Sequence, residues 1–181
     1  MNNSSDMATA SANAASDNAG DVTQYLSFFL ADEEYGVSIL SVQEIKGAQK
    51  VTPIPNAPEH VLGVINLRGT VVPIMDLRRR FHMTPASFDA NTVFIVVHVH
   101  EGEHSRTVGV VVDAVSQVYD VPHAAINPPP EVGGALNAEF IDGLVTMDEK
   151  MVILLDISKL INVGMLGDEL APQHAPLAGA A

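Results

Sequence analysis

Hydrophobic residues along this chain fall into short runs that are separated by polar turns. Many of these runs are rich in β-branched or aromatic residues, which is typical of strands. Among the strands predicted in this way are Tyr25–Leu30, Tyr35–Ile39, Gly63–Leu67, Thr70–Met75, Thr92–His100, Thr107–Tyr119, Phe140–Met147 and Met151–Leu155. A total of about nine or ten short strands with minor helix favours two small β-barrels over a parallel α/β sheet.

The few predicted helices are short. Ser41 is placed to cap a turn of helix through Val42–Ile45. Asp76 is expected to cap a basic helix at Leu77–Phe81, and Asp156 to cap a closing helix. Each aspartate cap is expected to stabilise its helix by about 1 kcal/mol.

The hydrophobic pattern occurs twice. Gly63–Leu77 and Gly143–Ile157 share the order glycine, apolar run, polar turn, apolar run, aspartate. Gly36–Ile45 aligns without gaps on Gly109–Val118. Two similar β-rich units are therefore expected side by side, and the groove between them is the first place to look for function.

The repeat is broken at two charged positions. Glu44 in the first copy corresponds to Gln117 in the second, and Arg68 corresponds to Asp148. Because the repeated fold does not require these charges, we hypothesise that Glu44 and Arg68 lie close together and orient the edge of the groove. An exposed pair contributes only about 0–1 kcal/mol to folding, so its value would lie in recognition.

Four apolar positions occupy equivalent places in the two copies. Val42 corresponds to Val115, and Ile45 corresponds to Val118. Val42 and Val115 are expected to line the groove, where an amphipathic helix would insert apolar anchors. For Ile45 and Val118 the core is the favoured position.

Composition narrows the possible partners. The chain has 22 acidic and 9 basic residues, a net charge of −13, which argues against nucleic acid or an anionic membrane surface. It contains no cysteine, which excludes disulfides and thiolate chemistry and fits a reducing cytoplasm. No apolar run approaches the roughly 18 residues of a membrane helix, and no export signal is visible. The structured body is expected at 23–163, between a disordered tail at 1–22 and a flexible tail at 164–181.

Signs of catalytic or metal chemistry are weak. His98, His100 and His104 form the best metal-like cluster, but a polar hairpin tip is the favoured interpretation, so no metal and no cofactor are expected. No histidine or nucleophile accompanies Asp113 or Asp142 at a sequence spacing that indicates a catalytic site. No catalytic motif is present either. An enzyme is the least favoured class.

The ordered series GVSILSVQEI, GVINLRGTVVPIMDLR, NTVFIVV, VGVVVDAVSQV and FIDGLVTMDEKMVILLDISKLI resembles the CheW family of bacterial chemotaxis coupling proteins. The resemblance covers Tyr25 to Ile161. It implies a mainly β fold of two five-stranded, SH3-like lobes without catalytic activity. It further implies a stand-alone cytoplasmic adaptor at membrane-associated receptor arrays, bridging the chemoreceptor tip and the regulatory domain of the chemotaxis histidine kinase. The resemblance also allows rings that are built from the adaptor alone.

The resemblance also implies contact residues. Positions linked to the receptor groove are Val42, Glu44, Gly63, Arg68, Gly109, Val115 and Val118, and positions on the kinase-facing side are Thr92, Val93 and Phe94. Two features depart from the family pattern. The segment His98–Arg106 is longer than the usual hairpin turn, and Phe94 replaces a smaller aliphatic residue. The second departure is expected to alter the preferred kinase partner.

Two other classes of function remain open from sequence. The chain would also suit a scaffold of this fold in a receptor pathway other than chemotaxis. A small-molecule sensor that uses the groove as a pocket is the other alternative.

Overall fold

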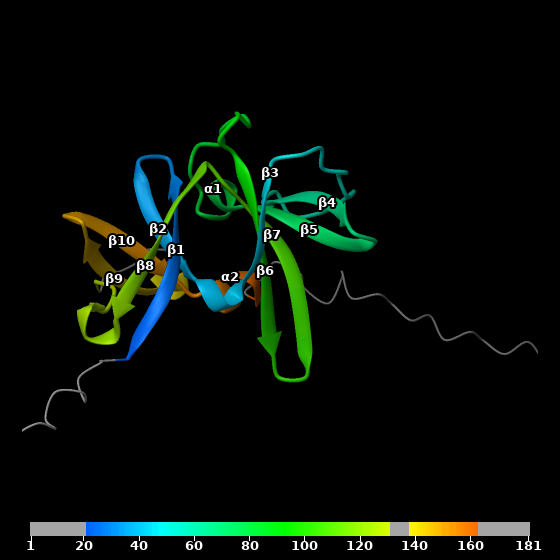
Figure 1. Ribbon diagram of the computed structural model, residues 1–181. Helices are drawn as coiled ribbons and strands as arrows, with labels where there is room; N and C mark the ends of the chain where they lie inside the picture. The colour runs from blue at the N-terminus through cyan, green and yellow to red at the C-terminus, as the bar shows by residue number, and fades with distance from the viewer. Residues whose placement is uncertain (1–20, 131–137, 163–181) are drawn as a thin grey trace, which may run out of the picture.

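The computed structural model describes residues 21–130 and 138–162, so the tails expected at 1–22 and 164–181 lie almost entirely outside the described residues. Its ten strands form two five-stranded sheets, which we call lobe 1 and lobe 2 (Figure 1). Lobe 1 has the strand order β8 (Ala114–Pro122), β1 (Val22–Leu30), β2 (Glu33–Ser38), β10 (Lys150–Leu155) and β9 (Ile141–Met147). Lobe 2 has the order β3 (Val42–Gly47), β6 (Val93–Glu101), β7 (His104–Val112), β5 (Thr70–Asp76) and β4 (Val61–Leu67). The prediction of a mainly β fold with two five-stranded lobes is confirmed.

Helical segments are short. The α-helices are α1 (Leu77–Arg80) and α2 (Ile157–Asn162), and the 3-10 turns are η1 (Ile39–Ser41), η2 (His123–Ala125) and η3 (Ala138–Phe140). Both predicted aspartate caps are confirmed. The Asp76 carboxylate accepts hydrogen bonds from the backbone N–H groups of Arg78 and Arg79, and the Asp156 carboxylate accepts one from Lys159. These bonds satisfy N–H groups that have no partner within the helix.

Each lobe combines strands from both halves of the sequence: β1 and β2 lie in lobe 1 with β8, β9 and β10, and β6 and β7 lie in lobe 2 with β3, β4 and β5. β3 follows β2 of lobe 1 along the chain, yet it pairs with β6 of lobe 2. β8 follows β7 of lobe 2, yet it pairs with β1 of lobe 1. The repeat units therefore do not coincide with the lobes, since each lobe takes two of its five strands from the other half of the chain.

A shared hydrophobic core joins the lobes. Phe28 of β1, Ile95 of β6 and Leu160 of α2 are fully buried in the same cluster. Each side chain of this size contributes roughly 1.5–3 kcal/mol when it is fully buried. Smaller clusters lie within lobe 2, around Phe94, and within lobe 1, around Leu154. The central cluster makes the two lobes one folding unit.

The helical turn predicted at Val42–Ile45 is wrong. These residues belong to strand β3, and the helical turn is η1, immediately before it. Ile45 and Lys46 lie opposite Ile95 and Phe94 of β6, so tertiary pairing overrides the local capping signal of Ser41. The short segment becomes an edge strand because β6 supplies its backbone hydrogen-bond partners.

The long strand predicted at Thr107–Tyr119 is broken at Asp113, where the chain passes from lobe 2 to lobe 1. The neighbouring segment His98–Arg106 is strand rather than loop. Its pairing continues to Glu101 and His104, with Gly102 at the turn in a left-handed conformation (φ 58°). The additional length is a β-hairpin that projects from the body of the protein (Figure 1).

Candidate functional site

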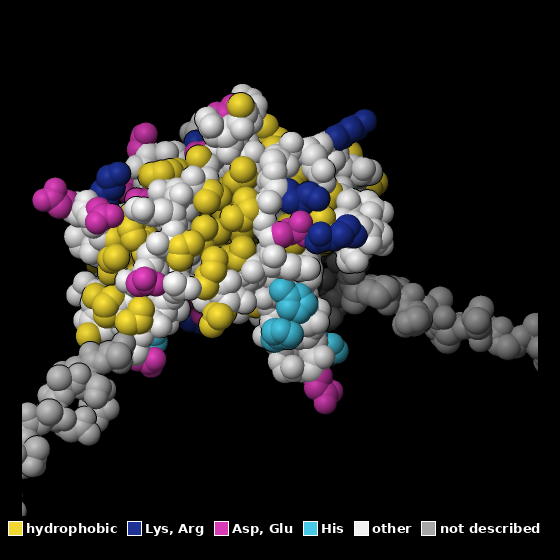
Figure 2. Space-filling model, viewed as in Figure 1, with side chains coloured by type: hydrophobic (Ala, Val, Ile, Leu, Met, Phe, Trp, Pro, Cys, Tyr) yellow, Lys and Arg dark blue, Asp and Glu magenta, His cyan; other side chains and the backbone are white. Residues whose placement is uncertain are grey.

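The candidate site lies between the edge strands of the two lobes. β8 ends the strand order of lobe 1 and β3 ends that of lobe 2. Figure 2 shows hydrophobic side chains gathered in a band between these two strands. Val42 of β3 and Val115 of β8 are both half-buried and pack against the central cluster. We call this surface the interlobe groove, with Val42 and Val115 on the edge strands of the two lobes that border it.

The prediction that Ile45 and Val118 belong to the core is wrong. Ile45 is 43% exposed and Val118 is 46% exposed. Both lie on edge strands whose side chains alternate between two faces, and the face that carries them is not covered. The two positions are equivalent in the repeat, but neither is buried, because the outer face of both strands is open to solvent.

Glu44 and Arg68 form an ion pair at the edge of lobe 2, as hypothesised. The Glu44 side chain is 21% exposed on β3, and the Arg68 guanidinium, 70% exposed, reaches it from the turn between β4 and β5. Arg68 has a left-handed backbone (φ 51°), and the Asn66 side chain accepts a 2.8 Å hydrogen bond from the Gly69 N–H. The turn therefore presents the guanidinium to solvent and to the edge strand at once.

The same place in lobe 1 holds a different pair. The Gln117 amide lies 3.5 Å from the Asp148 carboxylate, to which it donates a hydrogen bond. Asp148 shares the left-handed conformation of Arg68 (φ 48°). The two lobes thus repeat the geometry of the turn and the edge strand, while only lobe 2 carries a cation there. This difference makes the two edges chemically distinct to a partner.

Gly63 and Gly109 allow neighbouring chain segments to approach closely inside lobe 2. Gly63 has φ 141°, and a Cβ there would lie 2.0 Å from the carbonyl oxygen of Thr52. A Cβ at Gly109 would lie 2.5 Å from the Cδ1 atom of Ile74. Both glycines are buried, so they are required for close packing of neighbouring chain segments.

The three positions implied on the kinase-facing side differ in exposure. Phe94 is fully buried and Thr92 is buried, while Val93 is partly exposed. The Thr92 hydroxyl accepts a 2.9 Å hydrogen bond from the Asp89 N–H, and the Asp89 carboxylate accepts bonds from the N–H groups of Asn91 and Thr92. These bonds lower the pKa of Asp89, with the bond from Asn91 as the largest cause. Thr92 and Phe94 therefore lie beneath the surface, and Val93 is the member of the set that reaches it.

The histidines of the projecting hairpin do not form a ligand set. The rings of His98 and His100 lie edge to face with centroids 4.6 Å apart, and His98 is hydrogen-bonded to the Thr107 hydroxyl at 2.9 Å. His104 lies across the hairpin from Glu101. Within 21–130 and 138–162, no group of three or more histidine or acidic side chains is placed to hold a metal ion.

Leu40 and Phe88 are exposed apolar residues that the hydrophobic pattern did not mark as surface positions. Leu40 of η1 is 89% exposed at the passage from β2 to β3. Phe88 is exposed and its ring contacts that of Phe94 edge to face, with centroids 5.9 Å apart. Leu40 lies between the predicted strand Tyr35–Ile39 and the predicted turn at Val42–Ile45, and its exposure follows from η1, which the sequence pattern does not predict.

Comparison with known proteins gives consistent results. The model of the CheW-like domain matches residues 24–164. Chemotaxis protein CheW of Klebsiella aerogenes is 44% identical over 153 residues, covering 83% of this chain and 90% of that protein. Probable chemotaxis protein CheW of Rhizobium etli is 39% identical over 145 residues, covering 80% and 90%.

A solved structure agrees with these relatives. The crystal structure of scaffolding protein TtCheW from Thermoanaerobacter tengcongensis is similar with a TM-score of 0.71 and 31% identity, covering 81% of this chain and 92% of that one. In the described part of the chain, no helix has the length and apolar character needed to span a bilayer. The match of the family model over most of the chain, together with these relatives, shows that the chain belongs to the CheW-like domain family.

Proposed function

We propose that this protein is a non-enzymatic chemotaxis adaptor that couples chemoreceptors to a CheA-type histidine kinase. The observation that carries the proposal is the pairing of Arg68 and Glu44 beside the apolar interlobe groove, in a chain that spans 90% of a protein named for chemotaxis. The solved relative is itself described as a scaffolding protein. An adaptor needs binding surfaces rather than a reactive group, and the described residues provide an apolar groove with an ion pair beside it.

The interlobe groove suits a helical partner. Val42 and Val115 present apolar surface from opposite lobes. We assign the exposed Leu40 of η1, two residues before Val42, to the same surface. An amphipathic helix binds such a surface through apolar anchors. The receptor's helical tip is the partner that we assign to it, with the Arg68–Glu44 pair setting register and orientation at the edge. Gly63 and Gly109 would act on this binding through the packing of lobe 2, and Val118 would contribute from the outer face of β8.

The kinase contact is assigned to the surface around Val93. Val93 is the partly exposed member of the implied set, while Thr92 and Phe94 hold that surface in shape. Each contact would be weak alone, but two contacts made at once raise the effective concentration of the partners. Such an assembly belongs on the cytoplasmic side of receptor arrays. Neither the non-chemotaxis scaffold nor the small-molecule sensor is favoured by the relatives.

Co-sedimentation tests the proposal. Membranes that carry a cognate chemoreceptor are mixed with the purified kinase, with and without this protein, and are then pelleted. The expected result is kinase in the pellet only when receptor and this protein are both present. Membranes that lack the receptor are the control. Kinase that remains in the supernatant under all conditions would contradict the proposal.

A further inference from the structure

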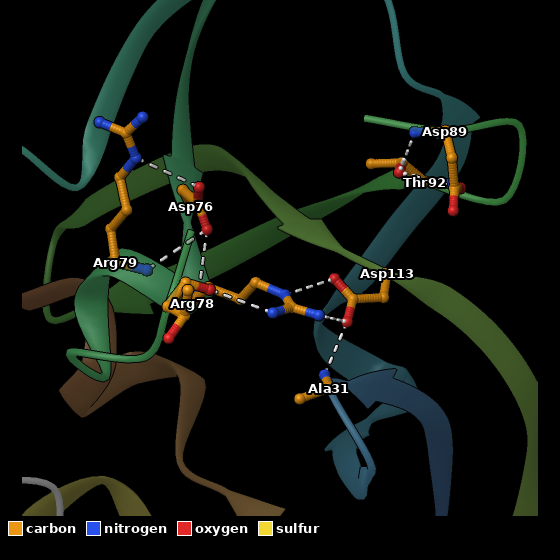
Figure 3. Close-up of polar contacts among 8 residues, drawn as sticks. Ala31, Asp76, Arg78, Arg79, Asp89, Thr92 and Asp113 are labelled. Carbon is orange, nitrogen blue, oxygen red and sulfur yellow. Dashed lines mark hydrogen bonds and ion pairs between the residues drawn. The ribbon is translucent and has the colours of Figure 1, made fainter. Parts of the chain in front are cut away.

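The Arg78–Asp113 ion pair joins helix α1, next to β5 of lobe 2, to the passage between β7 and β8 (Figure 3). The Arg78 guanidinium donates two hydrogen bonds to the Asp113 carboxylate, from Nε to Oδ1 at 2.8 Å and from Nη2 to Oδ2 at 2.5 Å. A bidentate pair of this kind is stronger and more directional than a single hydrogen bond between neutral groups. The bond to Asp113 is also the largest cause that raises the pKa of Arg78.

Asp113 contacts lobe 1 as well as lobe 2. It stands between β7 of lobe 2 and β8 of lobe 1. Its N–H donates to the Phe29 carbonyl at 3.0 Å, and its Oδ2 accepts from the Ala31 N–H at 2.6 Å. Arg78 belongs to α1, which continues β5 of lobe 2, and it also donates to the Thr84 carbonyl at 3.1 Å. The carboxylate thus connects the β1–β2 turn to helix α1.

The repeat provides this pair only once. In the repeat alignment Asp113 corresponds to Leu40 and Arg78 corresponds to Ser158. A leucine and a serine cannot form an ion pair, and Leu40 extends into solvent. An ion pair therefore fixes the segment between β7 and β8, whereas the equivalent positions cannot form one at the segment between β2 and β3. As with Glu44 and Arg68, charges at repeat-breaking positions are not needed to build the repeated fold.

The cation of this pair is better shielded than Arg68, Arg79 and Lys159, which form ion pairs elsewhere in the described chain. The Arg78 side chain is 18% exposed, whereas the Arg79 side chain is 43% exposed and the Lys159 side chain 58%. Shielding from solvent reduces screening by salt. Val115 of the groove follows Asp113 by two residues, so movement of Asp113 moves the start of β8.

We infer that Arg78 and Asp113 are positioning residues for partner binding, an interlobe clamp that holds β8 at a fixed distance from β3. The inference rests on the proposed function of the groove. Without the clamp, the central core still joins the lobes, but the groove samples more than one width. A receptor fragment then binds only the fraction of molecules with the correct width.

The test uses the full-length chain, which contains no cysteine and accepts two spin labels at introduced sites. Thr70→Cys and Lys150→Cys place the labels at equivalent exposed positions, on β5 of lobe 2 and β10 of lobe 1. Asp113→Asn removes the charge but keeps an acceptor for the Ala31 N–H. Arg78→Lys keeps the charge but loses the bidentate geometry. Arg79→Ala, in the same helix, breaks an ion pair that stays within lobe 2 and is the matched control.

Pulsed electron paramagnetic resonance should give one narrow interlobe distance for the parent and for Arg79→Ala, and a broadened distribution for both clamp variants. If the competent width falls to about a tenth of the population, binding of a chemoreceptor cytoplasmic fragment weakens about tenfold. A narrow distance or unchanged binding in both clamp variants would overturn the inference. Unfolding of both variants would overturn it too, because the pair would then be needed for the fold itself. If the parent fails to bind the fragment, the proposed function fails, while the distance measurement still reports on the clamp.

Discussion

Arg68 and Glu44 form an ion pair at the edge of lobe 2, at the place where lobe 1 carries Asp148 and Gln117. The turn that presents Arg68 is left-handed in both lobes, so the backbone frame is the same and only the charge differs. An exposed pair of this kind adds about 0–1 kcal/mol to stability. Its presence at one edge alone therefore points to recognition.

Reversing the charge of Arg68 separates recognition from folding. Arg68→Glu should shift the melting temperature measured by circular dichroism by no more than about 4 °C, because the side chain is solvated. The same variant should sharply weaken co-sedimentation of the kinase with receptor-bearing membranes. Lys159→Glu reverses another exposed, ion-paired cation and should leave assembly unchanged. Normal assembly of Arg68→Glu, or its unfolding, would refute the role assigned to Arg68.

A charge exchange tests whether Glu44 and Arg68 act together. Glu44→Arg alone should weaken receptor binding, and the double variant Glu44→Arg with Arg68→Glu should recover part of the loss because the pair is restored. Isothermal titration with a receptor cytoplasmic fragment gives the coupling free energy, expected at about 1 kcal/mol. Strictly additive effects would show that the two side chains act independently.

The two buried glycines should differ in their tolerance of a methyl group. Gly63→Ala should lower the free energy of unfolding by about 2 kcal/mol or more, since the backbone is left-handed and the Cβ meets the fixed carbonyl of Thr52. Gly109→Ala should cost less, because the Cβ meets only the end of the Ile74 side chain, which has other rotamers. Urea unfolding of both variants measures the difference. Equal losses of unfolding free energy would show that Thr52 and Ile74 accommodate the added methyl group equally well.

Leu40 offers a test of the groove that leaves the core intact. Leu40→Ala should not lower the melting temperature, because its side chain is almost fully exposed. It should weaken receptor-fragment binding measured by titration, since an apolar anchor is lost. Val22→Ala changes another exposed apolar residue, at the start of β1, and is the control. Unchanged affinity of Leu40→Ala would remove Leu40 from the groove surface.

His60 should make the protein sensitive to mild acid. Burial is the largest cause that lowers the pKa of His60 below its usual 6.5, followed by the charges of Arg80 and His82. The unfolded chain therefore takes up a proton on His60 before the folded chain does, and stability is lost as the pH falls through 6.5. His60→Gln should show a shallower decline of melting temperature between pH 8 and 5. Parallel declines in both proteins would assign the acid sensitivity elsewhere.

Sequence reasoning recovered the strands that have their own hydrophobic pattern, and the caps at Asp76 and Asp156, because those signals are local. It also brought Glu44 and Arg68 together, since a repeat reveals which charges the fold does not need. It failed where tertiary pairing decides the outcome. β3 is a strand because β6 pairs with it, and Ile45 and Val118 are exposed because the outer faces of β3 and β8 are open to solvent. The sequence alone did not pair Asp113 with Arg78, because the two residues are 35 positions apart and only the fold brings them together.

The most direct test of the account is reconstitution of receptor, kinase and ATP with and without this protein. The account predicts that kinase autophosphorylation rises strongly only when all three proteins are present, and that attractant suppresses the rise. Kinase activity that is indifferent to this protein, with receptor present and the protein folded, would contradict the coupling function.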